Sequence, residues 1–199
     1  MEHGVMDEAF WDDMYRETSR KWSGKPNPQL VAEVSGLKPG TALDVGCGEG
    51  ADAIWLAERG WQVTGADVSS VALERAKEHS AEVKWLHLDL TKEHAPDTYD
   101  LVTAHYVHLK PKEDMVLVYK RIAEAVAPGG TLLIVGHDKQ EMHRHEIDVP
   151  DDIFFGAEEI TSLLSLDEWK VEVSETRTLD NPDHRMYDFV FRASRVTPR

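Results

Sequence analysis

The sequence has 199 residues, of which 41% are hydrophobic and 30% are charged. This composition predicts a globular domain with an ordinary core and excludes an intrinsically disordered chain. The net charge of −15 argues against nucleic acid as the main partner, because a phosphate backbone would be repelled. No apolar run reaches the ~18–20 residues of a membrane helix, so we expect no membrane partner.

The N-terminus and the cysteine count predict the compartment. The first ten residues, MEHGVMDEAF, are acidic and do not resemble a secretory signal. Cys47 is the one cysteine, so no internal disulfide can form, which is typical of a reducing compartment. We therefore expect a cytoplasmic protein, whose oligomeric state the sequence does not indicate.

Strand and helix patterns alternate along the chain, which predicts a parallel sheet with helices on both faces. Residues 7–21 are expected to form an opening helix with Phe10 and Met14 on one side. Asn27 followed by Pro28 predicts the start of a second helix, because Asn caps well and Pro suits the first helical position.

The remaining elements follow in order. The expected parallel strands are 41–45, 61–66, 83–88, 99–104 and 131–135. The expected helices are one from the glycine-rich turn to Gly60, then 71–79, 113–127 and 157–166. The helix at 113–127 places Met115, Val118, Ile122 and Val126 at steps of three and four, the spacing of a buried stripe. Two runs at 169–175 and 186–193 look like a terminal antiparallel pair.

The segment ALDVGCGEG at 42–50 joins the first parallel strand to the next helix. Glycines permit positive φ angles and close approach of a ligand, and the helix that follows offers free N–H groups. Ligands of open parallel sheets bind beyond the carboxyl ends of the strands. We therefore expect a nucleotide-like ligand at residues 46–50.

The turn alone fits two classes of ligand. Gly46, Gly48 and Ala51 also satisfy the dinucleotide fingerprint. Asp67 follows about 20 residues later, where a ribose-binding acid belongs. A dinucleotide-binding oxidoreductase is therefore a real alternative.

The acids near the turn favour a different ligand. Asp44, at the end of the first parallel strand, would repel a diphosphate and attract a cation. Asp89 closes the third parallel strand as Asp67 closes the second, and the chain has no room for a separate substrate domain. An adenosine with a cationic amino-acid tail suits all three acids, and S-adenosylmethionine is such a ligand.

Five motifs together resemble the class I S-adenosylmethionine-dependent methyltransferases. They are LDVGCGEG at 43–50, VTGAD at 63–67, LDL at 88–90, YDLV at 99–102 and PGGTLL at 128–133. They follow the order of the family motifs and cover about residues 40–136. The resemblance implies a Rossmann-like, doubly wound α/β fold with a mostly parallel seven-stranded sheet in the order 3-2-1-4-5-7-6, helices on both faces and a C-terminal antiparallel strand pair.

The resemblance also implies a division of the chain. One methyltransferase domain would fill residues 1–199. Its parts would be an N-terminal helical cap at 7–35, a cofactor-binding core at 40–136, a substrate-side loop at 137–156, and a C-terminal helix and strand pair at 157–193.

The resemblance further implies which residues bind the cofactor. Those against the methionine moiety would be Asp44, Gly46, Cys47 and Gly48. Asp67 would bind both ribose hydroxyls. The contacts to adenine, and one backbone contact after the fourth parallel strand, would come from Val68, Asp89, Leu90 and His105.

The stretch from Phe10 to Trp22 resembles the cap of thiopurine- and tellurite-type small-molecule methyltransferases. Tyr15 and Trp22 would then lie over the sulfonium, where cation–π attraction is worth about 0.5–2 kcal/mol. These aromatic residues can equally be packing residues, and both interpretations stay open.

The implied activity is in-line transfer of a methyl group from S-adenosylmethionine to a small-molecule acceptor, with S-adenosylhomocysteine as the product. Positioning supplies much of such catalysis, and a base is needed only if the acceptor must lose a proton. His105, His108 and His137 follow strands at the ligand end, but nothing in the sequence selects among them, so no catalytic residue is assigned.

Two further points complete the analysis. No closed metal-binding pattern appears in the sequence, so we expect no metal. A non-catalytic S-adenosylmethionine-binding protein is a second alternative, because its cofactor motifs would look the same.

Overall fold

The structure is a computed structural model that describes residues 5–17, 23–144, 155–179 and 186–197. The helices are α1 (Glu8–Arg16), α2 (Pro28–Val34), α3 (Ala51–Glu58), α4 (Ser70–His79), α5 (Lys112–Glu124), α6 (Lys139–Arg144) and α7 (Ala157–Leu163). The strands are β1 (Thr41–Val45), β2 (Gln62–Asp67), β3 (Lys84–His87), β4 (Tyr99–His105), β5 (Val126–His137), β6 (Trp169–Leu179) and β7 (Met186–Arg195).

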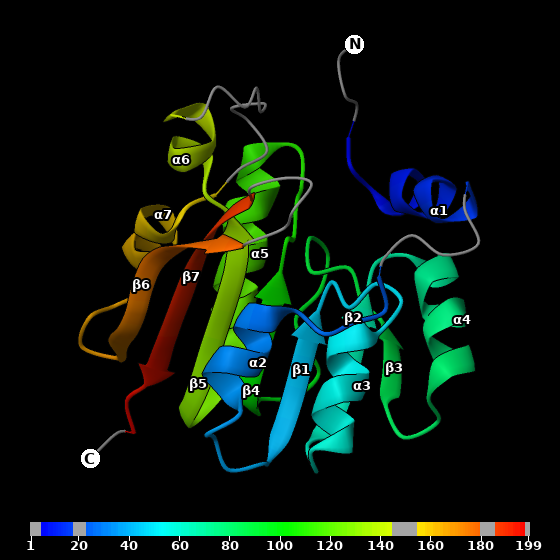
Figure 1. Cartoon of the computed structure of the whole chain (residues 1–199), viewed down its shortest axis with the longest axis horizontal. Helices are drawn as coiled ribbons and strands as arrows, with labels where there is room; N and C mark the ends of the chain where they lie inside the picture. Colours follow the sequence, from blue (N-terminus) through cyan, green and yellow to red (C-terminus); the bar gives the residue numbers. More distant parts are fainter. Residues whose placement is uncertain (1–4, 18–22, 145–154, 180–185, 198–199) are drawn as a thin grey trace.

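All seven strands form one sheet in the order β3-β2-β1-β4-β5-β7-β6, which confirms the expected topology. Strands β1 to β5 are parallel, whereas β7 runs antiparallel to both β5 and β6. The carboxyl ends of the parallel strands therefore share one edge of the sheet, at the top of Figure 1, and α1 lies on that side.

The core lies on both faces of the sheet because side chains alternate along each strand. Leu43 and Val45 of β1 belong to the hydrophobic cluster that α5 and α7 cover. Ala42 belongs to the second cluster, which α2 and α3 cover. This double covering explains why the central strands are apolar on both sides.

Helix α5 confirms the expected buried stripe but ends earlier than predicted. Met115, Val118 and Ile122 are all buried. The helix ends at Glu124, and Val126 already pairs with Tyr99 in the sheet. The Tyr99 N–H donates to the carbonyl of Ala125 at 2.8 Å, so strand pairing takes over the backbone before the Pro-Gly-Gly turn is reached.

The opening helix is present as α1, and its buried side chains are Asp12 and Tyr15 rather than the apolar Phe10 and Met14. Phe10 is 38% exposed, whereas Asp12 is 7% and Tyr15 is 4% exposed. Asp12 is buried because its carboxylate accepts hydrogen bonds from Ser69 Oγ at 2.6 Å and from Val71 N at 3.2 Å, at the start of α4. Polar docking through Asp12 and burial of Tyr15 together hold α1 in place.

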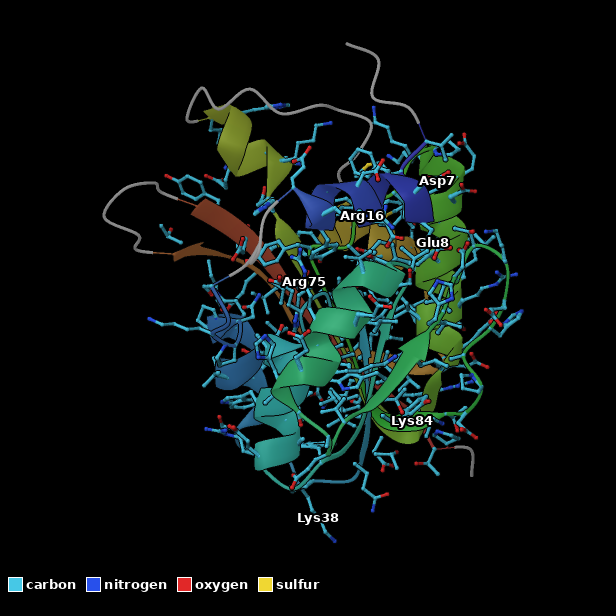
Figure 2. The ribbon with its side chains drawn as sticks, turned by 90° about the vertical axis from the view of Figure 1, so that its right-hand side faces the viewer. Asp7, Glu8, Arg16, Lys38, Arg75 and Lys84 are labelled. Carbon is cyan, nitrogen blue, oxygen red and sulfur yellow. The ribbon has the colours of Figure 1, made fainter. Side chains whose placement is uncertain are left out.

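Figure 2 shows this docking from the side: α1 lies across the upper end of α4, with Asp7 and Glu8 at one end of α1 and Arg16 at the other. Arg16 pairs with Asp12 at 3.2 Å and with the exposed Asp13 at 2.9 Å. Helix α1 is therefore attached to the carboxyl edge of the sheet through the N-terminus of α4.

The region at 137–156, expected to be a loop, contains a short helix. Asp138 Oδ1 accepts from the N–H of Glu141 at 3.0 Å and so begins α6. The sequence analysis missed α6 because its start is set by this side-chain hydrogen bond and not by a periodic pattern of apolar residues. Residues 145–154 lie outside the described residues. Within the described ranges, no helix has the length and apolar composition to cross a bilayer.

The C-terminal strands extend beyond their expected bounds. Strand β6 continues to Leu179 and β7 to Arg195, because the two pair with each other and β7 also pairs with β5. Helix α7 ends at Leu163, three residues earlier than expected, and Leu166 is 73% exposed.

Asp12 gives the first prediction. Asp12→Ala removes a buried carboxylate acceptor of hydroxyl and amide groups, so it should cost about 1.5–3 kcal/mol of unfolding free energy and speed amide exchange over α1. The matched control is Asp13→Ala, on the same helix and exposed, which should stay within about 0.5 kcal/mol of the parent. Equal exchange in both variants would show that Asp12 does not dock α1.

Candidate functional site

The glycine-rich turn after β1 is held open by left-handed backbone. Gly46, Gly48 and Gly50 have φ angles of 68°, 54° and 87°, which other residues rarely adopt. The Cys47 N–H donates to the carbonyl of Ala66 at 3.0 Å, so the turn lies alongside the end of β2. The close approach of a ligand to this backbone stays a prediction.

Asp67 links this turn to the next one. Its Oδ2 accepts from Gly48 N, and its Oδ1 accepts from Ser69 N, both at 2.8 Å. The residue is only 8% exposed. Burial raises the pKa of Asp67, although the two amide hydrogen bonds oppose that shift.

Asp44 is the least satisfied acid of the site. It is 2% exposed, and Thr103 Oγ1 donates to its Oδ1 at 2.9 Å. Its Oδ2 is buried without a hydrogen-bond partner. Burial, with the Asp52 carboxylate nearby, raises the pKa of Asp44 to about 7. A cationic group beside Oδ2 would remove this cost.

His105 lies next to Asp44. Its side chain, and not only its backbone, lies at the site. Its Nδ1 is 2.7 Å from Asp52 Oδ2, and its Nε2 is buried without a hydrogen-bond partner. Burial by itself lowers the pKa of His105, but the Asp52 carboxylate outweighs burial and the net shift is upward. Protonation makes Nε2 a donor in the site.

Asp52 is the residue that the sequence analysis missed. It lies in the first turn of α3, directly after the glycine-rich turn, and accepts from Asn27 N at 2.6 Å. Asp44, Asp52 and His105 each offer a ligand atom, all within 4.8 Å of one another. Such a group can hold a metal ion or an ammonium group. An acid in the first helical turn after a glycine motif was the available signal.

The thiol of Cys47, the one cysteine of the sequence, lies beside the acids of the site. Burial raises the pKa of the Cys47 thiol well above its usual range, and the neighbouring Asp67 and Asp44 raise it further. The thiol therefore stays protonated at neutral pH.

Tyr15 reaches the site edge through α1. Arg75 of α4 donates to the Tyr15 carbonyl, lies 5.9 Å from the Tyr15 ring centre, and pairs with Glu49 of the glycine-rich turn at 3.0 Å. Figure 2 shows Arg75 near the upper end of α4, below α1. Arg75 thus joins the cap to the turn, and its guanidinium is a cation near Tyr15. Trp22 lies outside the described residues.

The residues expected at adenine lie at the ends of β2 and β3. Val68 is half-buried, and its carbonyl accepts from His87 at 2.9 Å. Asp89 accepts from Thr91 N at 2.9 Å and pairs with Lys92 at 2.7 Å, so it closes the turn after β3. The Leu90 side chain belongs to the core cluster on the α5 face.

Comparison with known proteins now identifies the domain. Residues 42–130 match the family model described as a methyltransferase domain. A 2-heptyl-1-hydroxyquinolin-4(1H)-one methyltransferase of Mycobacteroides abscessus is 32% identical over 127 residues, which cover 59% of this chain and 56% of that protein. The chain thus spans little more than half the length of this curated relative.

Solved structures share the fold. The N-methyltransferase NodS of Bradyrhizobium japonicum, in complex with S-adenosyl-L-homocysteine, superposes with a TM-score of 0.69 at 20% identity, covering 94% of this chain and 98% of that one. TehB of Haemophilus influenzae gives a TM-score of 0.68 at 17% identity, covering 94% and 67%. The chain therefore carries a methyltransferase domain at residues 42–130, set in the fold of the class I S-adenosylmethionine-dependent methyltransferases.

Proposed function

We propose that this protein transfers a methyl group from S-adenosylmethionine to a small-molecule acceptor. The observation that carries the proposal is a pair of buried, unpartnered polar atoms beside the glycine-rich turn, Asp44 Oδ2 and His105 Nε2. An anionic acceptor beside a cationic donor is complementary to the ammonium and carboxylate of an amino acid. The methionine end of the cofactor carries both groups.

The same turn is unsuited to a diphosphate. A dinucleotide site presents free N–H groups of the glycine-rich turn to phosphate oxygens. Here the Gly48 N–H is already donated to Asp67. The carboxylates of Asp44 and Asp52 add negative charge at the same place, which would repel a phosphate. These features favour the sulfonium cofactor over the dinucleotide alternative.

The remaining cofactor contacts follow from the resemblance. Asp67 binds the ribose hydroxyls through the lone pairs that its two amide bonds leave over. The rest of the proposed set is Tyr15, Trp22, Gly46, Cys47, Gly48, Val68, Asp89 and Leu90. When bound, the cofactor supplies a methyl group on a sulfonium, which leaves as a neutral thioether. The chain itself supplies orientation and exclusion of water.

A small molecule is the acceptor class that the chain favours. The net charge of −15 opposes binding of RNA or DNA. Relatives differ in the acceptors for which they are named: one is named for a hydroxyquinolone, and another for ribosomal RNA of the small subunit. The acidic surface favours the first kind. We also propose a soluble, cytoplasmic location, in keeping with the single cysteine.

Asp67→Ala tests the cofactor site. Loss of a charge-assisted hydrogen bond to ribose should weaken S-adenosylhomocysteine binding by about 2–3 kcal/mol in calorimetry. The matched control is Asp100→Ala, because Asp100 closes the opposite, amino end of the sheet by accepting from Thr41 N at 2.9 Å. The control should bind as the parent does.

The same titrations separate the alternatives. Binding of NADH without binding of S-adenosylhomocysteine would contradict the proposal and support a dinucleotide-binding oxidoreductase. Binding of S-adenosylhomocysteine with no turnover of labelled cofactor, across thiols, phenols, amines and tellurite, would favour a non-catalytic binding protein.

Asp44 predicts a pH dependence. Its pKa of about 7 means that the carboxylate ionises only as pH rises through neutrality. Because the ammonium binds the ionised form, S-adenosylhomocysteine affinity should rise about tenfold between about pH 6 and pH 8. Asp44→Asn should bind S-adenosylhomocysteine weakly at both pH values, and its affinity should not change between them. An unchanged slope in Asp44→Asn would assign the titration to another group.

The folding stability of the free protein should change with pH in the opposite direction to ligand affinity. The folded pKa of Asp44 lies above its unfolded value of 3.8, so ionisation opposes folding from about pH 4 upward. Asp44→Asn should therefore raise the melting temperature of the free protein at about pH 8 while it weakens ligand binding. A melting temperature that falls at this pH would contradict the burial cost assigned to Asp44.

A further inference from the structure

The Asp52 carboxylate is held from two sides at the start of α3. Its Oδ1 accepts from the backbone N–H of Asn27 at 2.6 Å, and its Oδ2 lies 2.7 Å from His105 Nδ1. Asn27 is itself fixed, because its side chain caps α2 by accepting from Gln29 N at 2.9 Å. Both oxygens of Asp52 are therefore engaged by groups from two other elements, and the carboxylate has a defined orientation.

The contact with Asp52 fixes the imidazole ring of His105. An ionised carboxylate can only accept, so Nδ1 carries the proton of this hydrogen bond. The His105 side chain is 5% exposed, and its Nε2 is buried without a hydrogen-bond partner among the described residues. Asp52 therefore sets the orientation in which His105 presents Nε2.

The charges around His105 favour the protonated ring. Burial lowers the pKa of His105, but the carboxylates of Asp52 on α3, Asp44 on β1 and Asp188 on β7 raise it, and the net shift is upward. Both ring nitrogens of an imidazolium are donors. A buried Nε2–H without an acceptor costs free energy, and a ligand that accepts from it would recover that cost.

Asp44 offers the opposite chemistry a short distance away. Asp44, Asp52 and His105 each have a polar atom that lies within 4.8 Å of those of the other two. Asp44 Oδ2 and His105 Nε2 nevertheless do not bond to each other. A ligand that satisfies both needs a cationic donor for the first and an anionic acceptor for the second. The ammonium and carboxylate of an α-amino acid are attached to one carbon and suit such a pair.

We propose that His105, positioned by Asp52, binds the α-carboxylate of S-adenosylmethionine and makes the site selective for a cofactor that retains this group. The inference rests on the proposed function and adds the feature by which the site recognises its cofactor. Asp52 is a positioning residue because it acts through His105, while Asp44 binds the ammonium. Decarboxylated S-adenosylmethionine has the same sulfonium and the same ammonium, but it would leave His105 Nε2 buried and unpaired. The site should therefore reject it.

The test is calorimetry with S-adenosylhomocysteine and two of its analogues, one without the carboxylate and one without the ammonium. All titrations contain EDTA, so that no metal ion bridges the three side chains. The parent should bind the decarboxylated analogue about ten- to hundredfold more weakly than S-adenosylhomocysteine, because a charge-assisted hydrogen bond is lost.

Asp52→Asn keeps the size of the side chain and removes its charge. It should weaken binding of S-adenosylhomocysteine and of the deaminated analogue about tenfold, and bind the decarboxylated analogue at least as tightly as the parent does. His105→Gln should give the same pattern. The double variant should be no weaker than His105→Gln alone, because Asp52 acts through that ring. A merely structural Asp52 would affect all three ligands alike.

Two further variants serve as controls. Glu124→Gln is matched to Asp52→Asn, because Glu124 also pairs with a histidine, His94 at 3.0 Å, but both side chains are exposed. It should bind all three ligands as the parent does. Asp44→Asn should give the complementary pattern, with weaker binding of S-adenosylhomocysteine and of the decarboxylated analogue, and unchanged binding of the deaminated one.

The two proposals fail in different ways. The assignment of His105 and Asp52 is overturned if the parent binds S-adenosylhomocysteine and the decarboxylated analogue equally. It is also overturned if Asp52→Asn weakens all three ligands by the same factor, or none of them. Either result leaves the proposed function intact. If the parent does not bind S-adenosylhomocysteine, the proposed function is overturned and the assignment falls with it.

Discussion

The two hydrogen bonds that Asp67 accepts are the interaction on which the arrangement of the site depends. They tie the glycine-rich turn after β1 to the turn after β2, through Gly48 N and Ser69 N. Ser69 in turn caps α4 by accepting from Ala72 N, and donates to Asp12 of α1. One carboxylate thus connects two strand ends, a helix start and the cap.

A second constraint is electrostatic. Burying Asp44 with one oxygen unpaired costs free energy that the folded chain does not recover by itself. The cost is concentrated beside the glycine-rich turn, where Asp52 raises it further. Natural proteins sit only modestly above their stability threshold, so an uncompensated acid of this kind is typical of a binding site and not of a core. In the proposed function, a cation completes the turn.

Much of the framework could be predicted from local sequence. Glycines between an apolar strand and a helix are a local signal, and so are acids that close successive strands. These signals predict that Asp44 and Asp67 lie at the carboxyl edge of the sheet. The order of the strands required the family resemblance, because periodicity alone does not say which strands pair.

What the sequence could not predict depends on contacts between distant residues. Nothing near Asp12 in the sequence signals its burial, which is decided by Ser69 and Val71, more than fifty positions away. Asp52 is recognised as part of the site only from its contact with His105, 53 positions away. The early start of β5 is set by pairing with Tyr99, which no local pattern encodes. The histidines were visible, but their partners were not: His105 lies against Asp52 and His137 against Asp188.

Strand β7 lies beyond the stretch 42–130 that matches the methyltransferase family model, yet it supplies Asp188 beside His137. Strand β7 is hydrogen-bonded on both sides, to β5 and to β6, so the hairpin continues the sheet that the family model covers only in part. The glycine-rich turn follows β1, which is separated from β5 by β4. Sequence changes in β7 can therefore alter the surroundings of His137 without touching that turn.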